Sequence, residues 1–217
     1  MNVRYLLVVC ALSVLSFVSS APAVQKSSLI TREDLERALD MPCPELTDET
    51  EQISVRDLIR LLSDHMTKQH GKPIQIFPEY MELDVAGIKS LNDVKITRMN
   101  ITAGTHTNRE FFDLMLSQTT DPTLTWIPRQ RHILLSTTDH AESDDCLETV
   151  VYDVSTLRMD PESLIDLFQE HTSPPATWFD IDQEGGRISA YGSRLVISQT
   201  YRVHRRIQQI LKDLGEP

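Results

Sequence analysis

The stretch from residue 147 to the end constrains the fold most, because its apolar residues recur first at strand spacing and then at helix spacing. Residues 147–154, 186–191 and 194–198 are predicted strands, and residues 160–168 and 200–214 are predicted helices. Each helix carries a single apolar stripe, so both are expected on one face of a three-stranded sheet whose other face stays in water. The pattern therefore predicts a small α+β domain, spanning residues 147–215, in the order βαββα.

Residues at the ends of these segments support the same prediction. Asp160 is placed to cap the first helix, and Pro161 suits its first position because no amide hydrogen is needed there. Gly215 is placed to end the second helix. Gly192 lies in a predicted tight hairpin turn, where glycine supplies the positive φ that such turns require.

Residues 30–137 predict a second small α+β domain with helices on one face of a short open sheet. Thr31, Ser54 and Thr107 each precede an apolar stripe and have an acidic residue three positions later, which is the pattern of a helix start. The predicted order is helix, helix, strand, strand, helix, strand, strand, with the strands at residues 73–77, 94–101, 124–127 and 132–136.

Residues 138–146 are polar and acidic, and we expect a linker with one helical turn. At its end lies Cys146. Cys146 and Cys43 are the two cysteines that lie outside a predicted secretory signal at residues 1–21. In an oxidising compartment these two residues form a disulfide, or they stay unpaired as two small core residues. Both alternatives stay open, because sequence does not fix the distance between the two Cα atoms.

Residues 1–21 have the pattern of a cleaved secretory signal. Arg4 precedes an apolar run over residues 6–18, and small residues surround the predicted cut after Ala21 or Ala23. The run is short for a bilayer span, so we expect no membrane span in the mature chain. The mature protein is expected in the periplasm or outside the cell.

The charge balance disfavours nucleic acid and anionic lipid as partners. The formal net charge is −11, and it becomes −12 without Arg4. Binding to phosphate groups draws its affinity from clustered lysine and arginine side chains. We therefore expect protein partners.

The capped helices and the segment at residues 124–127 resemble the short amino-terminal domain of secretins and of some TonB-dependent receptors. The arrangement predicted for residues 147–215 resembles the ring-building domains that follow it in secretins. Such domains pack against neighbouring copies or against regulatory and secretion partners in the periplasm. The resemblance thus implies binding without catalytic residues, and it extends over nearly all of the mature chain.

No residue pattern indicates catalysis, a cofactor or a metal. The chain lacks a Gly-x-Ser-x-Gly turn, and Gly185 and Gly186 precede a predicted strand where a phosphate-binding loop would precede a helix. The histidines do not recur at zinc-ligand spacing, and His140 lies in the acidic linker, which indicates a solvated segment. We predict no catalytic, cofactor-binding or metal-binding residue.

Candidate docking residues lie in two places. Arg202, Arg205 and Arg206 form a basic cluster on the last helix, which either complements a helix dipole and a nearby acidic surface or docks an acidic partner. Trp178 either fills the core or anchors a partner. Asn100, within a predicted strand, starts a glycosylation sequon.

The leading hypothesis is an exported, non-catalytic protein-interaction module that binds a partner in the cell envelope, or itself, through sheet edges and helix faces. The alternative is an exported hydrolase or small-molecule sensor with a site between the two domains. That alternative predicts a deep pocket with converging polar groups and a strongly perturbed ionisable residue.

Overall fold

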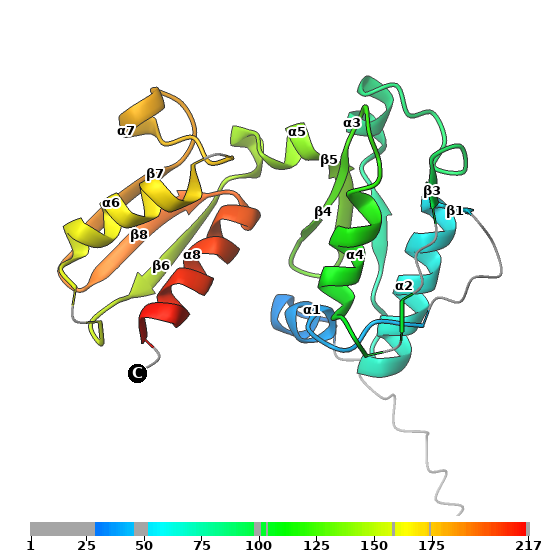
Figure 1. Cartoon of the computed structure of the whole chain (residues 1–217), viewed down its shortest axis with the longest axis horizontal. Helices are drawn as coiled ribbons and strands as arrows, with labels where there is room; N and C mark the ends of the chain where they lie inside the picture. The colour runs from blue at the N-terminus through cyan, green and yellow to red at the C-terminus, as the bar shows by residue number, and fades with distance from the viewer. Residues whose placement is uncertain are drawn as a thin grey trace, which may run out of the picture.

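The computed structural model describes residues 29–45, 52–97, 101–102, 104–157, 159–173 and 175–215. Helices account for 44% and strands for 23% of the described residues, and the strands form open sheets, so the predicted α+β class is confirmed. The buried apolar residues fall into two clusters, one from Leu35 to Leu135 and the other from Val154 to Ile207. Figure 1 shows the two corresponding units side by side. We call residues 29–137 the N-terminal unit and residues 147–215 the C-terminal unit.

Three predictions concern residues outside this description. The predicted signal at residues 1–21 and Asn100 of the sequon are not among the described residues, and the predicted strand at 94–101 is described only in part.

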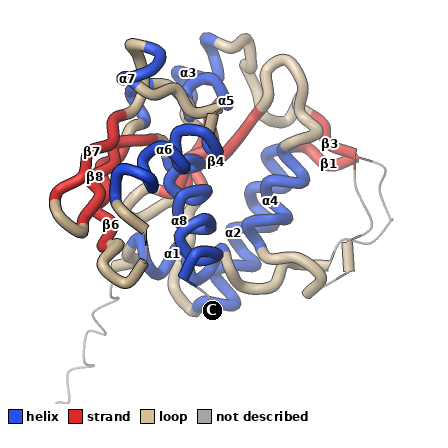
Figure 2. The backbone as a smooth tube through the Cα atoms, turned by 60° about the vertical axis from the view of Figure 1, so that its left-hand side comes forward, coloured by secondary structure: helices blue, strands red, loops and turns tan. Residues whose placement is uncertain are grey.

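The N-terminal unit packs three main helices against a small sheet. Its elements are α1 (Arg32–Leu39), β1 (Gln52–Ser54), α2 (Val55–His70), β2 (Ile76–Pro78), α3 (Tyr80–Val85), β3 (Lys95–Thr97), α4 (Asn108–Leu116), β4 (Leu124–Pro128) and β5 (Ile133–Thr137). Strand β5 is central and pairs parallel with β2 and antiparallel with β4. Strands β1 and β3 form a separate antiparallel pair at the edge of the molecule farthest from the C-terminal unit (Figures 1 and 2).

The three predicted helix starts of this unit are confirmed. The Thr31 hydroxyl accepts a hydrogen bond from the Asp34 amide at 3.2 Å, and the Asp34 carboxylate accepts one from the Thr31 amide at 3.0 Å. Thr107 caps α4 in the same reciprocal way. The Ser54 hydroxyl accepts from the Asp57 amide at 3.1 Å and starts α2. These bonds satisfy amides that no helical carbonyl can reach.

The predicted element order of this unit was incomplete, because the structure contains β1 and α3 and the prediction contained neither. Strand β1 has three residues, which is too short to display an alternating pattern. Helix α3 begins without a side-chain cap bond, so it carries no start signal. Local sequence therefore gave no indication of either element.

The C-terminal unit has the predicted strand and helix order, with one short helix added. Its elements are β6 (Glu148–Asp153), α6 (Pro161–Thr172), α7 (Phe179–Asp182), β7 (Arg187–Tyr191), β8 (Arg194–Gln199) and α8 (Tyr201–Gly215). Strand β8 lies in the centre and pairs antiparallel with β6 and with β7. Asp160 caps α6 through its carboxylate, and Pro161 occupies the first position, as predicted.

Both long helices of this unit cover the same face of its sheet. Figures 1 and 2 show α6 and α8 together on one side of the three strands. Phe168 of α6 and Ile207 of α8 are fully buried in one cluster with Leu195 and Ile197 of β8. The opposite face carries Val151, which is 56% exposed. The one-sided arrangement predicted from the single apolar stripes is therefore observed.

Trp178 is a core residue, and the docking role considered for it is wrong. Its side chain is 0% exposed, and its indole nitrogen donates to the Thr172 hydroxyl at 3.2 Å. The preceding loop holds the residue inward, because Thr177 and Phe179 make backbone hydrogen bonds to Gly186 at the start of β7. A side chain with no exposed surface cannot anchor a partner.

The connection between the units contains α5 (Thr138–Ala141), so the predicted helical turn is present, followed by a short 3₁₀ turn, Asp144–Cys146. Thr137 caps α5 by accepting from the amide of His140 at 3.3 Å. The imidazole of His140 contacts the carboxylate of Glu79 at 3.4 Å. This segment therefore contacts the N-terminal unit through His140, while Asp139, Asp144 and Asp145 are exposed, as expected of a solvated linker.

The disulfide considered for Cys43 and Cys146 is not formed, and the alternative of two buried, unpaired cysteines describes both residues. Cys43 lies after α1, where its amide donates to the His106 carbonyl at 2.9 Å. The sulfur of Cys146 lies 3.5 Å from a guanidinium nitrogen of Arg129. The two cysteines thus lie in different local structures, and burial raises the pKa of the Cys146 thiol despite the opposing Arg129 charge.

None of the described helices combines the length and the apolar character needed to cross a bilayer.

Candidate functional site

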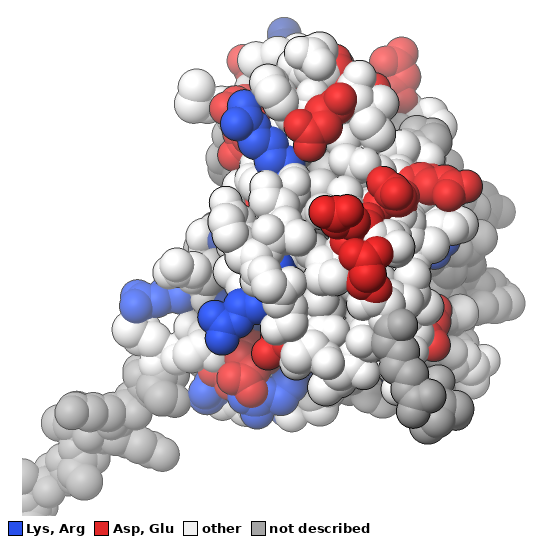
Figure 3. Space-filling view, turned by 90° about the vertical axis from the view of Figure 1, so that its left-hand side faces the viewer, with Lys and Arg blue, Asp and Glu red and all other residues white. Residues whose placement is uncertain are grey.

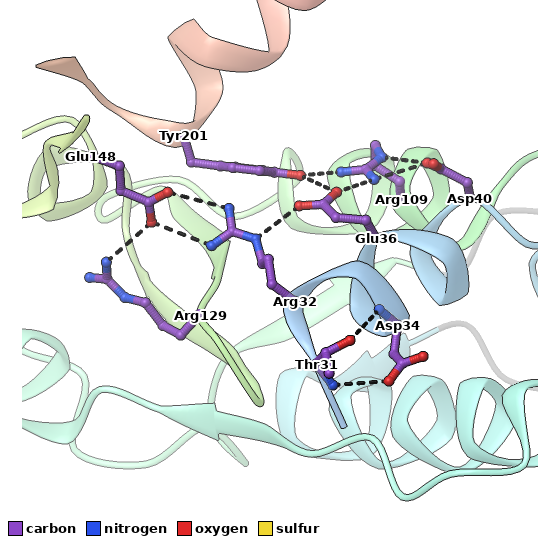
Figure 4. Close-up of polar contacts among 9 residues, drawn as sticks. All are labelled: Thr31, Arg32, Asp34, Glu36, Asp40, Arg109, Arg129, Glu148 and Tyr201. Carbon is purple, nitrogen blue, oxygen red and sulfur yellow. Dashed lines mark hydrogen bonds and ion pairs between the residues drawn. The ribbon is translucent and has the colours of Figure 1, made fainter. Parts of the chain in front are cut away.

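Four side chains from distant parts of the chain meet where the two units touch (Figure 4). Arg109 of α4 donates to the Asp40 carboxylate at 3.0 Å and to the Glu36 carboxylate at 2.8 Å. It also donates to the hydroxyl of Tyr201, which in turn donates to Glu36 at 3.1 Å. We call these four residues the seam network. The network ties the first residue of α8 to α1 and α4.

Three members of the seam network, Arg109, Glu36 and Tyr201, keep their protonation states around neutral pH. Burial acts to lower the pKa of Arg109, but Tyr201, Glu36 and Asp40 outweigh it and raise the pKa. Burial acts to raise the pKa of Glu36, but hydrogen bonds from Arg109 and Arg32 outweigh it and lower the pKa. Burial raises the pKa of Tyr201, so its hydroxyl stays protonated. Groups with fixed charges suit a structural contact between the units better than acid-base chemistry.

A second contact joins the units beside the first. The Glu148 carboxylate of β6 lies 3.4 Å from the guanidinium of Arg32 and 3.8 Å from that of Arg129 (Figure 4). The Arg32 guanidinium also lies 5.1 Å from the centre of the Tyr201 ring, a cation–π distance. The start of β6 is therefore fixed against α1 and against the turn between β4 and β5.

The residue patterns did not predict the seam network or the Arg32 contact beside it, although the sequence carries one signal of both. Arg32 and Arg109 occupy the first turns of α1 and α4, where the helix dipole disfavours a positive charge. An arginine at such a position needs an anion from elsewhere in the fold. Glu36, Asp40 and Glu148 supply those anions.

A pocket of about 170 Å³ opens beside the seam network, between α4, β4, α5 and α8. Arg202 and Arg205 of the predicted basic cluster line it, whereas Arg206 lines a separate hollow beside His171. Arg202 is held by the Glu142 carboxylate at 2.8 Å. Pockets for drug-sized molecules measure roughly 300–1,000 Å³, so this one has room only for a small ligand.

Asp113 is the other carboxylate that lines this pocket. Its oxygen accepts a hydrogen bond from the Trp126 indole at 2.7 Å. Desolvation raises the pKa of Asp113, although the indole bond and the charges of Arg202, Arg109 and Arg205 oppose the rise. At this place the alternative hypothesis of a site between the units therefore finds converging polar groups, but the pocket that holds them is small.

The sheet of the C-terminal unit has two outer strands, and β6 is the more open. The Val154 amide donates to the carbonyl of Ser193, which directly precedes β8, so the backbone groups of alternate residues of β6 face β8. Those of Thr149, Val151 and Asp153 point away from β8. Within the described residues, none of these three has a backbone hydrogen-bond partner on that side.

Strand β7 is open over a shorter length. Thr177 and Phe179 occupy the outward backbone groups of Gly186, with N···O distances of 3.0 and 2.8 Å. By the same alternation, Ile188 and Ala190 direct their backbone groups outward. Among the described residues they have no backbone partner on that side. The sheet therefore presents two unequal edges.

The C-terminal unit also presents exposed surface between these edges. On the face away from α6 and α8, Val151 is 56% exposed and Tyr191 is 69% exposed. Figure 3 views the molecule from the side of this unit and shows a wide uncharged surface, with the largest group of acidic side chains to the right of the centre and with basic side chains next to acidic ones at the top and at the bottom. Charge and apolar area are thus unevenly distributed on this side of the molecule.

No protein-family model matches the chain, and no curated protein sequence matches it. In the part of the chain that the structure describes, no group of three or more histidine, cysteine, aspartate and glutamate side chains is placed to hold a metal ion. A functional assignment therefore rests on the geometry of the seam and of the sheet edges.

Proposed function

We propose that the protein is an exported, non-catalytic protein-interaction module that binds a partner in the cell envelope, or a second copy of itself, through the edges of the β6-β8-β7 sheet. One observation carries the proposal. Both outer strands offer backbone amides and carbonyls that have no backbone partner among the described residues. The resemblance to the amino-terminal domains of secretins and TonB-dependent receptors supports the same role, and the predicted signal supports export.

An unpaired strand edge binds because an extended segment from another chain can complete its hydrogen bonds. The exposed side chains on the open face of the sheet add apolar area next to that edge, above all Val151 and Tyr191. Fixed contacts at the seam hold β6 in place before a partner arrives. A preformed edge binds with a smaller loss of conformational entropy than a mobile one.

Proline substitution at the outward positions Val151 and Ala190 tests the proposal. Proline lacks the amide hydrogen that an added strand would use, and outer strands tolerate it. If β6 or β7 is used for binding, we expect the proline variant in that strand to lose partner binding or self-association. The measurements are sedimentation velocity of the purified chain and capture of envelope proteins on it.

The matched controls are Val151→Ala and Ala190→Ser, which keep the amide hydrogen, and circular dichroism reports whether each variant folds. Folded proline variants at both edges that bind and associate like the native chain would exclude the sheet edges as the binding site.

A second candidate function is the binding of a small anion in the seam pocket. It is favoured by Arg205, which lines the pocket beside Arg202. Among the described residues, Arg205 has no hydrogen-bond or ion-pair partner. Titration calorimetry with acetate and inorganic phosphate tests it. Binding should occur in the native chain and disappear in Arg205→Gln, and heat changes of equal size in both would contradict it.

A further inference from the structure

A basic groove runs beside the start of β6. It is lined by the turn between β4 and β5, by α1 and by the first residues of β6, with a volume of about 830 Å³. The charged and polar side chains along it include Arg32, Arg129, Arg131, His132 and Glu148. Thr149, whose outward backbone groups begin the open edge of β6, lines the same groove. The groove and the strand edge therefore form one continuous surface.

The groove is positively charged within an acidic protein. Three arginines line it against the single carboxylate of Glu148, while the whole chain carries −11. Arg32 and Arg129 share that carboxylate, at 3.4 and 3.8 Å. Arg131 is exposed and has no ion pair among the described residues. Arg32 also pairs with the Glu36 carboxylate at 3.0 Å, so the positive charge that remains in the groove after the internal pairs are counted is that of Arg131.

The charge of the groove comes from its arginines. Burial lowers the pKa of His132, and the charge of Arg129 adds to this effect, so the imidazole is neutral at neutral pH. Its ring packs edge-on against Phe77 with the ring centres 5.3 Å apart. Phe77 is 46% exposed, so an apolar contact lies close to the charged groove.

We infer that the groove and the edge of β6 together bind an extended acidic segment of a partner protein. The segment adds as a strand along Thr149, Val151 and Asp153, and its carboxylates lie at the Thr149 end, beside Arg131 and Arg129. The inference rests on the proposed function and adds the chemistry of the partner. An extended peptide fits better than a nucleic acid, because only a peptide supplies amides and carbonyls in register with the strand. Opposite charge at one end fixes which end of the segment enters the groove.

Fluorescence polarisation with labelled peptides tests the inference on the purified chain. The probes are ten-residue peptides rich in β-branched residues, with three glutamates at the amino end, at the carboxyl end or replaced by glutamines. We expect one acidic peptide to bind about tenfold more tightly than its glutamine counterpart. The comparison of the two acidic peptides shows whether the added strand is parallel or antiparallel to β6, because the end that carries the glutamates should lie at Thr149.

Charge reversal in the groove gives the second arm. Arg131→Glu should weaken binding of the acidic peptide about tenfold. Arg206→Glu is the matched control, because it makes the same change of charge at an exposed position on α8 and should leave binding unchanged. Val151→Pro should abolish binding, whereas Val151→Ala should retain it.

Several outcomes would overturn the inference. Equal binding of the acidic and glutamine peptides, with loss in Val151→Pro, would reject the acidic partner and leave strand addition standing. Equal weakening by Arg131→Glu and Arg206→Glu would remove the groove from the interaction. Binding of the acidic peptide by Val151→Pro at native affinity would show charge attraction without strand addition. An oligonucleotide of matched charge that binds as tightly as the peptide would also reject the inference, as would the absence of any binding.

Discussion

At the scale of single residues, Arg109 shows how a buried charge can organise a contact. Its guanidinium reaches two carboxylates and a tyrosine hydroxyl, and it lies 5.5 Å from the ring centre of Trp126. Burying such a group costs solvation free energy that the ion pairs only partly return. Its main effect is therefore geometric, because few arrangements of α1, α4 and α8 satisfy all these donors at once.

His204 should make the stability of the protein depend on pH. Its Nε2 donates to the Glu148 carbonyl at 2.8 Å, and its Nδ1 lies 2.9 Å from the Tyr152 hydroxyl. Burial lowers its pKa from 6.5, helped by the charge of Arg32 and opposed by Glu148 and a backbone hydrogen bond with Gln199. The folded state thus holds the proton less tightly than the unfolded state. Its stabilising contribution is complete above pH 6.5 and is lost as pH falls through the lowered value.

Urea unfolding at about pH 7.5 and about pH 5.5 measures this effect. We expect the free energy of unfolding to fall between the two pH values, and to fall less in His204→Gln. His171→Gln is the control, because His171 is exposed. A pH dependence that is the same in both variants would assign the effect to other groups.

Residue types alone could not identify the residues at the seam. Glu36 and Tyr201 are 165 positions apart, and neither belongs to a motif. Their contact depends on how two separately folded units meet, which periodicity does not report. The first-turn positions of Arg32 and Arg109 were the sole local indication, and they indicate the need for an anion without showing which one.

At the scale of elements, caps and apolar stripes were predicted well because both are local. Thr31, Ser54, Thr107 and Asp160 each start a helix through bonds to residues within three positions. The single stripes on α6 and α8 correctly placed both helices on one sheet face. Loop residues were harder, because hydrophobicity does not tell whether a loop side chain turns inward or outward. Trp178 is the example, since its neighbours bond to Gly186 and turn it into the core.

Truncation of Trp178 should destabilise the C-terminal unit strongly. The side chain is fully buried beside Phe168 and Ile188, so Trp178→Ala leaves a cavity and should cost about 3–5 kcal/mol. Trp178→Phe should cost less because it keeps most of the apolar volume. Urea unfolding followed by circular dichroism measures both changes.

Ile181→Ala in α7 is the control for that experiment. Ile181 is 59% exposed, so its truncation should leave the unfolding midpoint close to that of the native chain. If Trp178→Ala matched this control, the indole would not be a main part of the core.

At the scale of the whole molecule, the two units have separate cores, and Tyr201 of the C-terminal unit contacts the N-terminal unit. Its ring packs partly against the N-terminal core and lies 5.7 Å from the Trp126 ring, centre to centre. Its hydroxyl joins Arg109 and Glu36. A residue of α8 thus completes the packing of the other unit, which couples the two units in folding.

Tyr201→Ala should uncouple the units. We expect one cooperative heat-absorption transition in the native chain and two in the variant, because the C-terminal unit loses its main apolar contact with the N-terminal core. Differential scanning calorimetry measures this directly. Tyr191→Ala, which truncates a tyrosine that is 69% exposed, should keep a single transition. Two transitions already present in the native chain would show that the units unfold independently.

The resemblance to secretin and receptor domains stays a prediction at this scale. The order of β6, α6, β7, β8 and α8 agrees with the arrangement that the resemblance implies, with α7 as an addition. Element order is a property of fold, and unrelated functions share folds. The partner chemistry must therefore come from the strand edge and the basic groove.

The inequality of the two strand edges has a consequence for assembly. If β6 of one molecule pairs antiparallel with β6 of another, a twofold axis relates them and growth stops at a dimer. If β6 pairs with β7 of the next molecule, every addition leaves a fresh β6 and β7 at the ends, and a fibre grows without limit. The segment Thr177–Phe179, by occupying the start of β7, shortens the edge on which such a fibre would depend.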